Sequence, residues 1–108
     1  MTQDKKTARA SFGDIAPRLA EITDDVLFGE VWKDPALSPR DRSLLTIASL
    51  VSLYRVNEIP FHLKRGLENG LTRDEIIGAI THLAFYAGWP PAMTALKIAR
   101  NVFADAEK

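Results

Sequence analysis

The sequence predicts an all-α protein, a small bundle of helices in one domain. Apolar residues recur at helical spacing along most of the chain. Ser, Thr, Pro and Gly stand at positions where helices begin and end, and no segment alternates in the manner of a strand. At 108 residues the chain is long enough for one domain, whose core gives marginal stability unless subunits associate.

The composition excludes several functional classes. Lys plus Arg equals Asp plus Glu at 14 each, so no net positive charge attracts nucleic acid. With no cysteine, the chain has no disulfide, thiolate metal site or thiol nucleophile. The longest nearly apolar run, 44–54, is too short to span a membrane, and the first residues lack the apolar core of a signal peptide. We therefore expect a cytoplasmic protein that binds no nucleic acid, membrane or metal.

Residues 1–10 are polar and are predicted to form a disordered N-terminal segment, with a single domain over 11–108. From Asp14 onward, apolar residues recur at helical spacing, and Pro17 falls in the tolerated first turn. Thr23 is a candidate start for a second short helix that continues through Trp32.

The next helix has a clear start signal, in which Ser38 caps, Pro39 occupies the first helical position and Asp41 lies in the first turn. This helix is predicted to run to about Arg55. Between residues 44 and 53 it has hardly any polar face, which indicates burial on most sides. In so small a domain, such a helix predicts a subunit interface.

Another helix is predicted over Glu58–Asn69, with Pro60 in its first turn and Gly70 in a left-handed stop. Thr72 and Glu75 form a capping box that opens the following helix. That helix is predicted to end at Gly88, and the prolines at 90 and 91 begin a last helix over 92 to about 103.

His62 is the first candidate for chemistry. It shares a helical stripe with apolar residues, so we expect partial burial, and Gly66 one turn later leaves room for a ligand or a neighbouring backbone. Glu58 lies one turn earlier, where its carboxylate can orient the imidazole and raise its affinity for a proton. Alternatively, His62 is a core histidine satisfied by a backbone carbonyl, and Glu58 merely favours a helix N-terminus.

His82 shares a face with Phe85, Tyr86 and Trp89 on the following helix. This aromatic face is either a pocket wall or, more commonly, an oligomer contact.

Arg40 and Arg42 lie in the first turn of the apolar helix, where cations are unfavourable, so an anionic partner is expected. Asp41, Glu58 and a substrate carboxylate are the candidates. A solvated surface role suits Arg40 better than Arg42.

The stretch from Leu27 to Phe103 resembles the carboxymuconolactone decarboxylase family. Three segments in this order carry the resemblance: LFGEVWKDPALSPRDRSLLT, EIPFHLKRGLENGLTRDEI and ITHLAFYAGWPPAMTAL. The resemblance implies a helical bundle of the alkylhydroperoxidase and carboxymuconolactone decarboxylase type. It also implies assembly as trimers or hexamers, with sites near subunit contacts.

One branch of this family contains alkylhydroperoxidase-type reductases, whose motif is a Glu, two cysteines and a His. Aligned on His62, the cysteine positions hold Arg55 and Glu58, and the Glu position holds Ser43. Because that reaction needs both thiols, dithiol-dependent peroxidase activity is predicted to be absent.

The decarboxylase branch is the better match, and the resemblance implies a carboxy-lyase that acts on gamma-carboxymuconolactone or a related ring compound in aromatic compound breakdown. Arg42, and with it Arg40, is then assigned to hold the dianionic substrate. His62, oriented by Glu58, is assigned to protonate the dienolate. The substrate-facing walls are assigned to Phe61, His82, Phe85, Tyr86 and Trp89.

The substrate is its own electron sink, so no cofactor is expected. Two other functions stay open, a thiol-independent oxidoreductase or redox accessory, and a noncatalytic oligomeric module. Family membership alone does not separate them, because members that share a fold differ in chemistry.

Overall fold

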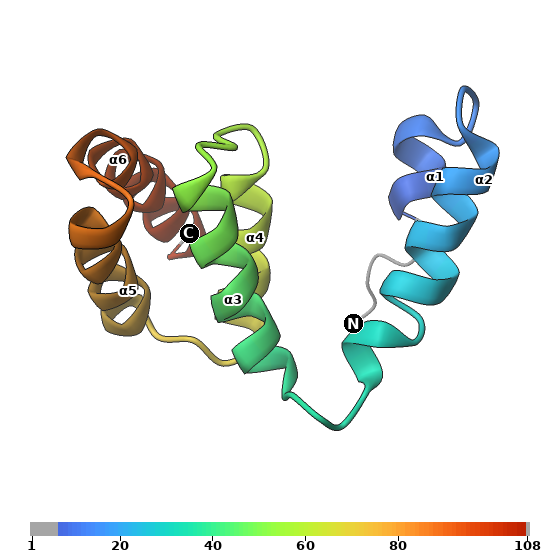
Figure 1. The fold of residues 1–108 in the computed structure, drawn as a ribbon, viewed down its shortest axis with the longest axis horizontal. Coiled ribbons are helices and arrows are strands. Elements are labelled where there is room, and N and C mark those ends of the chain that lie inside the picture. Colours follow the sequence, from blue (N-terminus) through green and yellow to red (C-terminus); the bar gives the residue numbers. More distant parts are fainter. Residues whose placement is uncertain (1–6, 108) are drawn as a thin grey trace. The chain divides into compact units, whose positions relative to one another are not determined.

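The computed structural model describes residues 7–107, and over this range every regular element is a helix (Figure 1). The chain divides into two compact units, residues 1–39 and residues 40–108. The sequence predicts one domain over 11–108, whereas the structure separates the first helices from the last four. Within residues 7–107, no helix is both long and apolar enough to cross a membrane.

The first unit is built from four short helical segments. They are α1 (Thr7–Phe12), α2 (Pro17–Glu21), the π-helix η1 (Ile22–Leu27) and the 3₁₀-helix η2 (Val31–Lys33). Pro17 lies at the start of α2, as its fixed φ angle favours. The helix expected from Asp14 is therefore shorter than predicted. The second helix, expected to begin at Thr23, is replaced by the π-helix η1.

Asp24 holds α1 in place in the first unit. Its carboxylate accepts hydrogen bonds from the backbone N–H groups of Ala8 and Arg9 at 3.0 and 3.1 Å, which are free donors at a helix N-terminus. The Arg9 guanidinium also pairs with Asp25 at 2.9 Å. Residues 7–10, which the sequence predicts to be disordered, are thus helical and bonded, while residues 1–6 lie outside the described range.

The second unit contains the long helices and the main core. They are α3 (Pro39–Ser52), α4 (Ile59–Glu68), α5 (Arg73–Tyr86) and α6 (Trp89–Ala106). The core consists of buried apolar side chains from all four helices and from the α4–α5 turn: Ile47, Val51, Ile59, Leu63, Leu71, Ile76, Ile80, Ala92, Ala95, Ala99 and Phe103. The three alanines on α6 let neighbouring helices approach it closely.

The predicted start and stop signals of these helices are found with one exception, although α6 runs from Trp89 to Ala106 and is longer than the predicted 92 to about 103. Thr72 and Glu75 form the capping box of α5, with both hydrogen bonds at 3.0 Å. Gly70 and Gly88 have φ angles of 108° and 111°, as their positions after α4 and before α6 require. The exception is α3, which ends at Ser52 rather than near Arg55 because Tyr54 turns the chain with a φ angle of 59°.

Candidate active site

His62 lies on α4 at the border between the core and the surface. Its neighbour Leu63 is fully buried, while the imidazole itself is half-buried, as the helical stripe predicts. The ring of Phe61 meets the imidazole edge to face, with ring centroids 5.0 Å apart. His62 thus lies in a partly apolar environment and is partly accessible to solvent.

Burial lowers the pKa of His62 below the ordinary histidine value of 6.5. The positive charge of Arg65 lowers this pKa further, and the negative charge of Glu58 opposes both effects. Glu58 therefore acts in the direction that the sequence predicts, but the net shift is downward. The imidazole is neutral at neutral pH when no ligand is bound.

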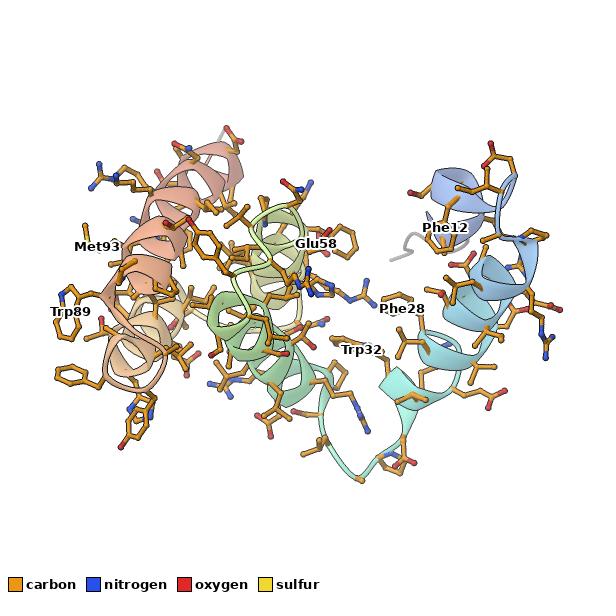
Figure 2. The ribbon with its side chains drawn as sticks, turned by 45° about the horizontal axis from the view of Figure 1, so that its top comes forward. Phe12, Phe28, Trp32, Glu58, Trp89 and Met93 are labelled. Carbon is orange, nitrogen blue, oxygen red and sulfur yellow. The ribbon has the colours of Figure 1, made fainter. Side chains whose placement is uncertain are left out.

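Glu58 occupies the N-cap position of α4 and is exposed (Figure 2). Its backbone carbonyl accepts a hydrogen bond from the His62 N–H at 3.4 Å. Its carboxylate lies one helical turn from the imidazole, which matches the electrostatic effect on the pKa of His62.

Gly66 allows neighbouring side chains to pack closely against α4, and it does not leave space for a ligand. A Cβ atom at this position would stand 2.9 Å from Cδ1 of Leu71 and 3.1 Å from Cδ1 of Ile47. The space that the missing side chain leaves is thus filled by the neighbouring turn and by α3. The sequence interpretation of this space as room for a ligand or a neighbouring backbone is wrong, because side chains of Leu71 and Ile47 fill it.

A polar contact joins α3 to the residue that follows α4. The Asn69 side-chain amide donates a hydrogen bond to Oγ of Ser43 at 3.0 Å, and Ser43 is fully buried. Arg42 precedes Ser43 on α3 and is half-buried. Arg42 thus lies near the start of α3, one residue before the side chain that contacts the C-cap of α4.

Arg40 has a different setting. Its guanidinium pairs with Asp41 at 3.2 Å and with the carboxylate of Glu75. Asp41 was among the anionic partners expected from the sequence, whereas Glu75, 35 residues away, was not. Because Glu75 also caps α5, Arg40 links the start of α3 to the start of α5, and the structure does not bring it beside His62.

The predicted aromatic walls divide into two groups. Phe61 contacts His62, whereas Phe85 and Tyr86 are 72% and 78% exposed. His82 stacks on Tyr86 at 4.7 Å, and Phe85 meets Trp89 edge to face at 5.1 Å.

Trp89, at the start of α6, lies away from Glu58, at the start of α4. Figure 2 shows Trp89 and Met93 pointing outward from the beginning of α6, on the side of the second unit opposite Glu58. Trp89 and its contact partner Phe85 are thus not placed with the beginning of α4.

Arg65 is a residue that the sequence interpretation missed. It lies three positions after His62 on α4, is half-buried, and affects the pKa of His62. Its i, i+3 spacing from His62 was the available signal. Among residues 7–107, no group of three or more His, Asp or Glu side chains is placed to hold a metal ion.

Comparison with known proteins gives the family. The model of the carboxymuconolactone decarboxylase family matches residues 17–101. The 4-carboxymuconolactone decarboxylase of Acinetobacter baylyi is 44% identical over 78 residues, which are 72% of this chain and 58% of the relative. The nitrosuccinic acid decarboxylase npaB of Metarhizium robertsii is 31% identical over 85 residues, which are 79% of this chain and 59% of the relative.

An uncharacterized 15.0 kDa protein of Paracoccus denitrificans is 27% identical over 96 residues, which are 87% of this chain and 72% of the relative. This chain spans less than two thirds of the length of both named decarboxylases. The family match nevertheless includes most of both structural units. The chain belongs to the carboxymuconolactone decarboxylase family.

Proposed function

We propose that the chain is a cofactor-free decarboxylase of gamma-carboxymuconolactone or a closely related carboxylated lactone, acting in aromatic compound breakdown. The observation that carries this proposal is the half-buried His62, which shares α4 with the cationic side chain of Arg65. Support for the reaction class comes from the relatives, since both named enzymes are decarboxylases.

The reaction needs no external electron acceptor. The bond between the ring carbon and its carboxylate breaks, carbon dioxide leaves, and the electron pair moves through the ring double bond onto the lactone carbonyl. The resulting dienolate takes one proton at the ring carbon next to the carbonyl. The protein must bind the dianion, stabilise the enolate oxygen and deliver that proton.

His62 is the proposed proton donor. The free imidazole is neutral at neutral pH, because burial and Arg65 lower its pKa. A bound carboxylate brings negative charge beside the ring, which raises the pKa and favours protonation in the complex. Glu58 acts in the same direction. Substrate binding thus favours the protonated imidazole of His62, which then donates its proton to the dienolate.

Arg42 is the proposed partner of one substrate carboxylate, and Phe61 the apolar wall beside the imidazole. The face of His82, Phe85, Tyr86 and Trp89 completes the site only if a second copy supplies it. We therefore propose assembly as a trimer or hexamer, in which the exposed aromatic face of one copy approaches His62 of another.

Turnover of gamma-carboxymuconolactone in D₂O tests this function. We expect loss of carbon dioxide and incorporation of a single deuterium at the ring carbon next to the lactone carbonyl. Proton NMR of the reaction mixture measures both changes. A purified, folded chain that leaves the lactone unchanged relative to a protein-free control contradicts the proposal. That result favours a noncatalytic oligomeric module.

A further inference from the structure

Arg65 and His62 lie on the same edge of α4. At about 100° per residue, they are about 60° apart around the helix, on one side of the buried face formed by Ile59 and Leu63. Lys64 is exposed and lies on the opposite side of the helix. Of these two cationic side chains, only that of Arg65 extends along the edge that carries the imidazole.

The environment of Arg65 suits an anion. The side chain is half-buried, so part of its charge is shielded from water and interacts more strongly with a nearby anion than a fully exposed charge does. Its effect on the pKa of His62 shows that the two groups are close enough to interact. The planar guanidinium can bind a carboxylate through two parallel hydrogen bonds.

Arg40, which the sequence analysis also assigns to the substrate, already forms ion pairs within the chain. Arg40 pairs with Asp41 and Glu75 at the starts of α3 and α5. Releasing it for a ligand would leave two carboxylates without this cation and would loosen the contact between the two helices. Arg40 is therefore an unfavourable partner for a substrate carboxylate.

We propose that Arg65 binds the carboxylate that the substrate retains, and that it makes the chain selective for ring compounds carrying two carboxylates. This assignment rests on the proposed function for the identity of the ligand. The retained carboxylate keeps its charge throughout, so its pairing contributes to binding without slowing the reaction.

A nonreactive ligand separates this assignment from catalysis. The saturated analogue of the lactone keeps both carboxylates but lacks the ring double bond, so it has no electron sink. Its ester at the retained carboxylate removes one charge. Binding of both compounds is measured by calorimetry on the whole chain and on R65Q, R65K and K64Q variants.

K64Q is the matched control, since both glutamine variants remove one positive charge from α4. We expect R65Q to weaken dicarboxylate binding about 10-fold or more, the usual contribution of a hydrogen bond to a charged group. We expect no change in ester binding, wild-type behaviour from K64Q, and partial recovery in R65K, which keeps the charge but loses the planar fork.

Equal dicarboxylate affinities for wild type and R65Q, or equal losses in R65Q and K64Q, overturn the assignment. So does a wild-type chain that does not bind the dicarboxylate. Circular dichroism of each variant establishes that it is folded. Turnover of the unsaturated lactone by the wild type is measured in parallel. If the chain binds the dicarboxylate through Arg65 but has no turnover, the proposed function fails while the Arg65 assignment stands.

Discussion

At His62, two charged neighbours on one helix act in opposite directions on a single imidazole. Glu58 precedes it by one turn and favours the protonated form, and Arg65 follows it by three residues and disfavours that form. Burial adds to the effect of Arg65, so the neutral form prevails in the free chain. A ligand that brings negative charge to this edge of α4 raises the pKa of His62 and favours the protonated form.

The lowered pKa of His62 predicts how stability depends on pH. The unfolded chain binds the proton more tightly than the folded chain, so stability is full above about pH 6.5 and falls as the pH decreases toward the folded-state pKa. His62→Gln removes this titration. We expect the loss of unfolding free energy between about pH 8 and about pH 5.5 to be smaller in the variant than in wild type, as measured by urea unfolding. Identical losses in both proteins would refute the pKa assignment.

At the scale of helices, the turns after α3 and α4 close with the same pair of backbone hydrogen bonds. After α4, Gly70 donates to Leu67 at 3.2 Å and Leu71 to Gly66 at 2.9 Å. After α3, Tyr54 donates to Val51 at 3.1 Å and Arg55 to Leu50 at 2.8 Å. Glycine adopts the required φ angle without strain, whereas tyrosine does so at a cost.

Two glycine substitutions on neighbouring elements are predicted to have opposite effects. Gly70→Ala should destabilise the chain by roughly 1–2 kcal/mol, because the left-handed backbone is unfavourable for a residue with a Cβ atom. Gly78→Ala should stabilise it by roughly 0.5–1 kcal/mol, because Gly78 lies inside α5 and a Cβ atom there meets no other atom within 4 Å.

Since neither alanine meets a close contact, these two changes isolate the backbone contribution. Denaturant unfolding of both variants gives the comparison. Shifts of the same sign in the two proteins would show that the backbone account of these positions is wrong.

Local signals explain how much of the fold was predictable. The cap at Thr72 and Glu75 and the stops at Gly70 and Gly88 depend on residues close in sequence, and all are found. The end of α3 at Tyr54 was not predictable, because tyrosine is not a typical left-handed residue. The π-helix η1 was missed because Asp24 contacts α1 15 and 16 residues earlier in the chain, beyond any local pattern.

The same distinction applies to the candidate site. The half-burial of His62 follows from helical spacing and was predicted. The ion pair between Arg40 and Glu75 joins residues 35 positions apart, so spacing could not assign it. The sign of the pKa shift at His62 depends on how burial and two opposing charges combine, which a residue pattern does not give.

At the scale of the whole molecule, exposed apolar side chains predict association. On α3 the buried residues Ile47 and Val51 face the core, while Leu45 is 58% exposed, and Leu53, just after the helix, is 64% exposed. Phe85 and Tyr86 on α5 are also exposed, and exposed apolar side chains of this kind are typical of contact surfaces. We expect a stable oligomer that buries at least ~1,000 Å² per contact. Light scattering coupled to size exclusion tests this, and a folded monomer at micromolar concentration would contradict it.

The decarboxylation rate of the His62→Ala variant tests the central claim most directly. If His62 delivers the proton, the variant should keep its fold and assembly, while its turnover of gamma-carboxymuconolactone falls about 10²-fold or more. If His62 is only a packing residue, the variant should lose a few kcal/mol of stability, with activity falling only as folded protein is lost. Thermal melting and turnover are measured on the same preparations. A stable His62→Ala variant with wild-type turnover would contradict the account.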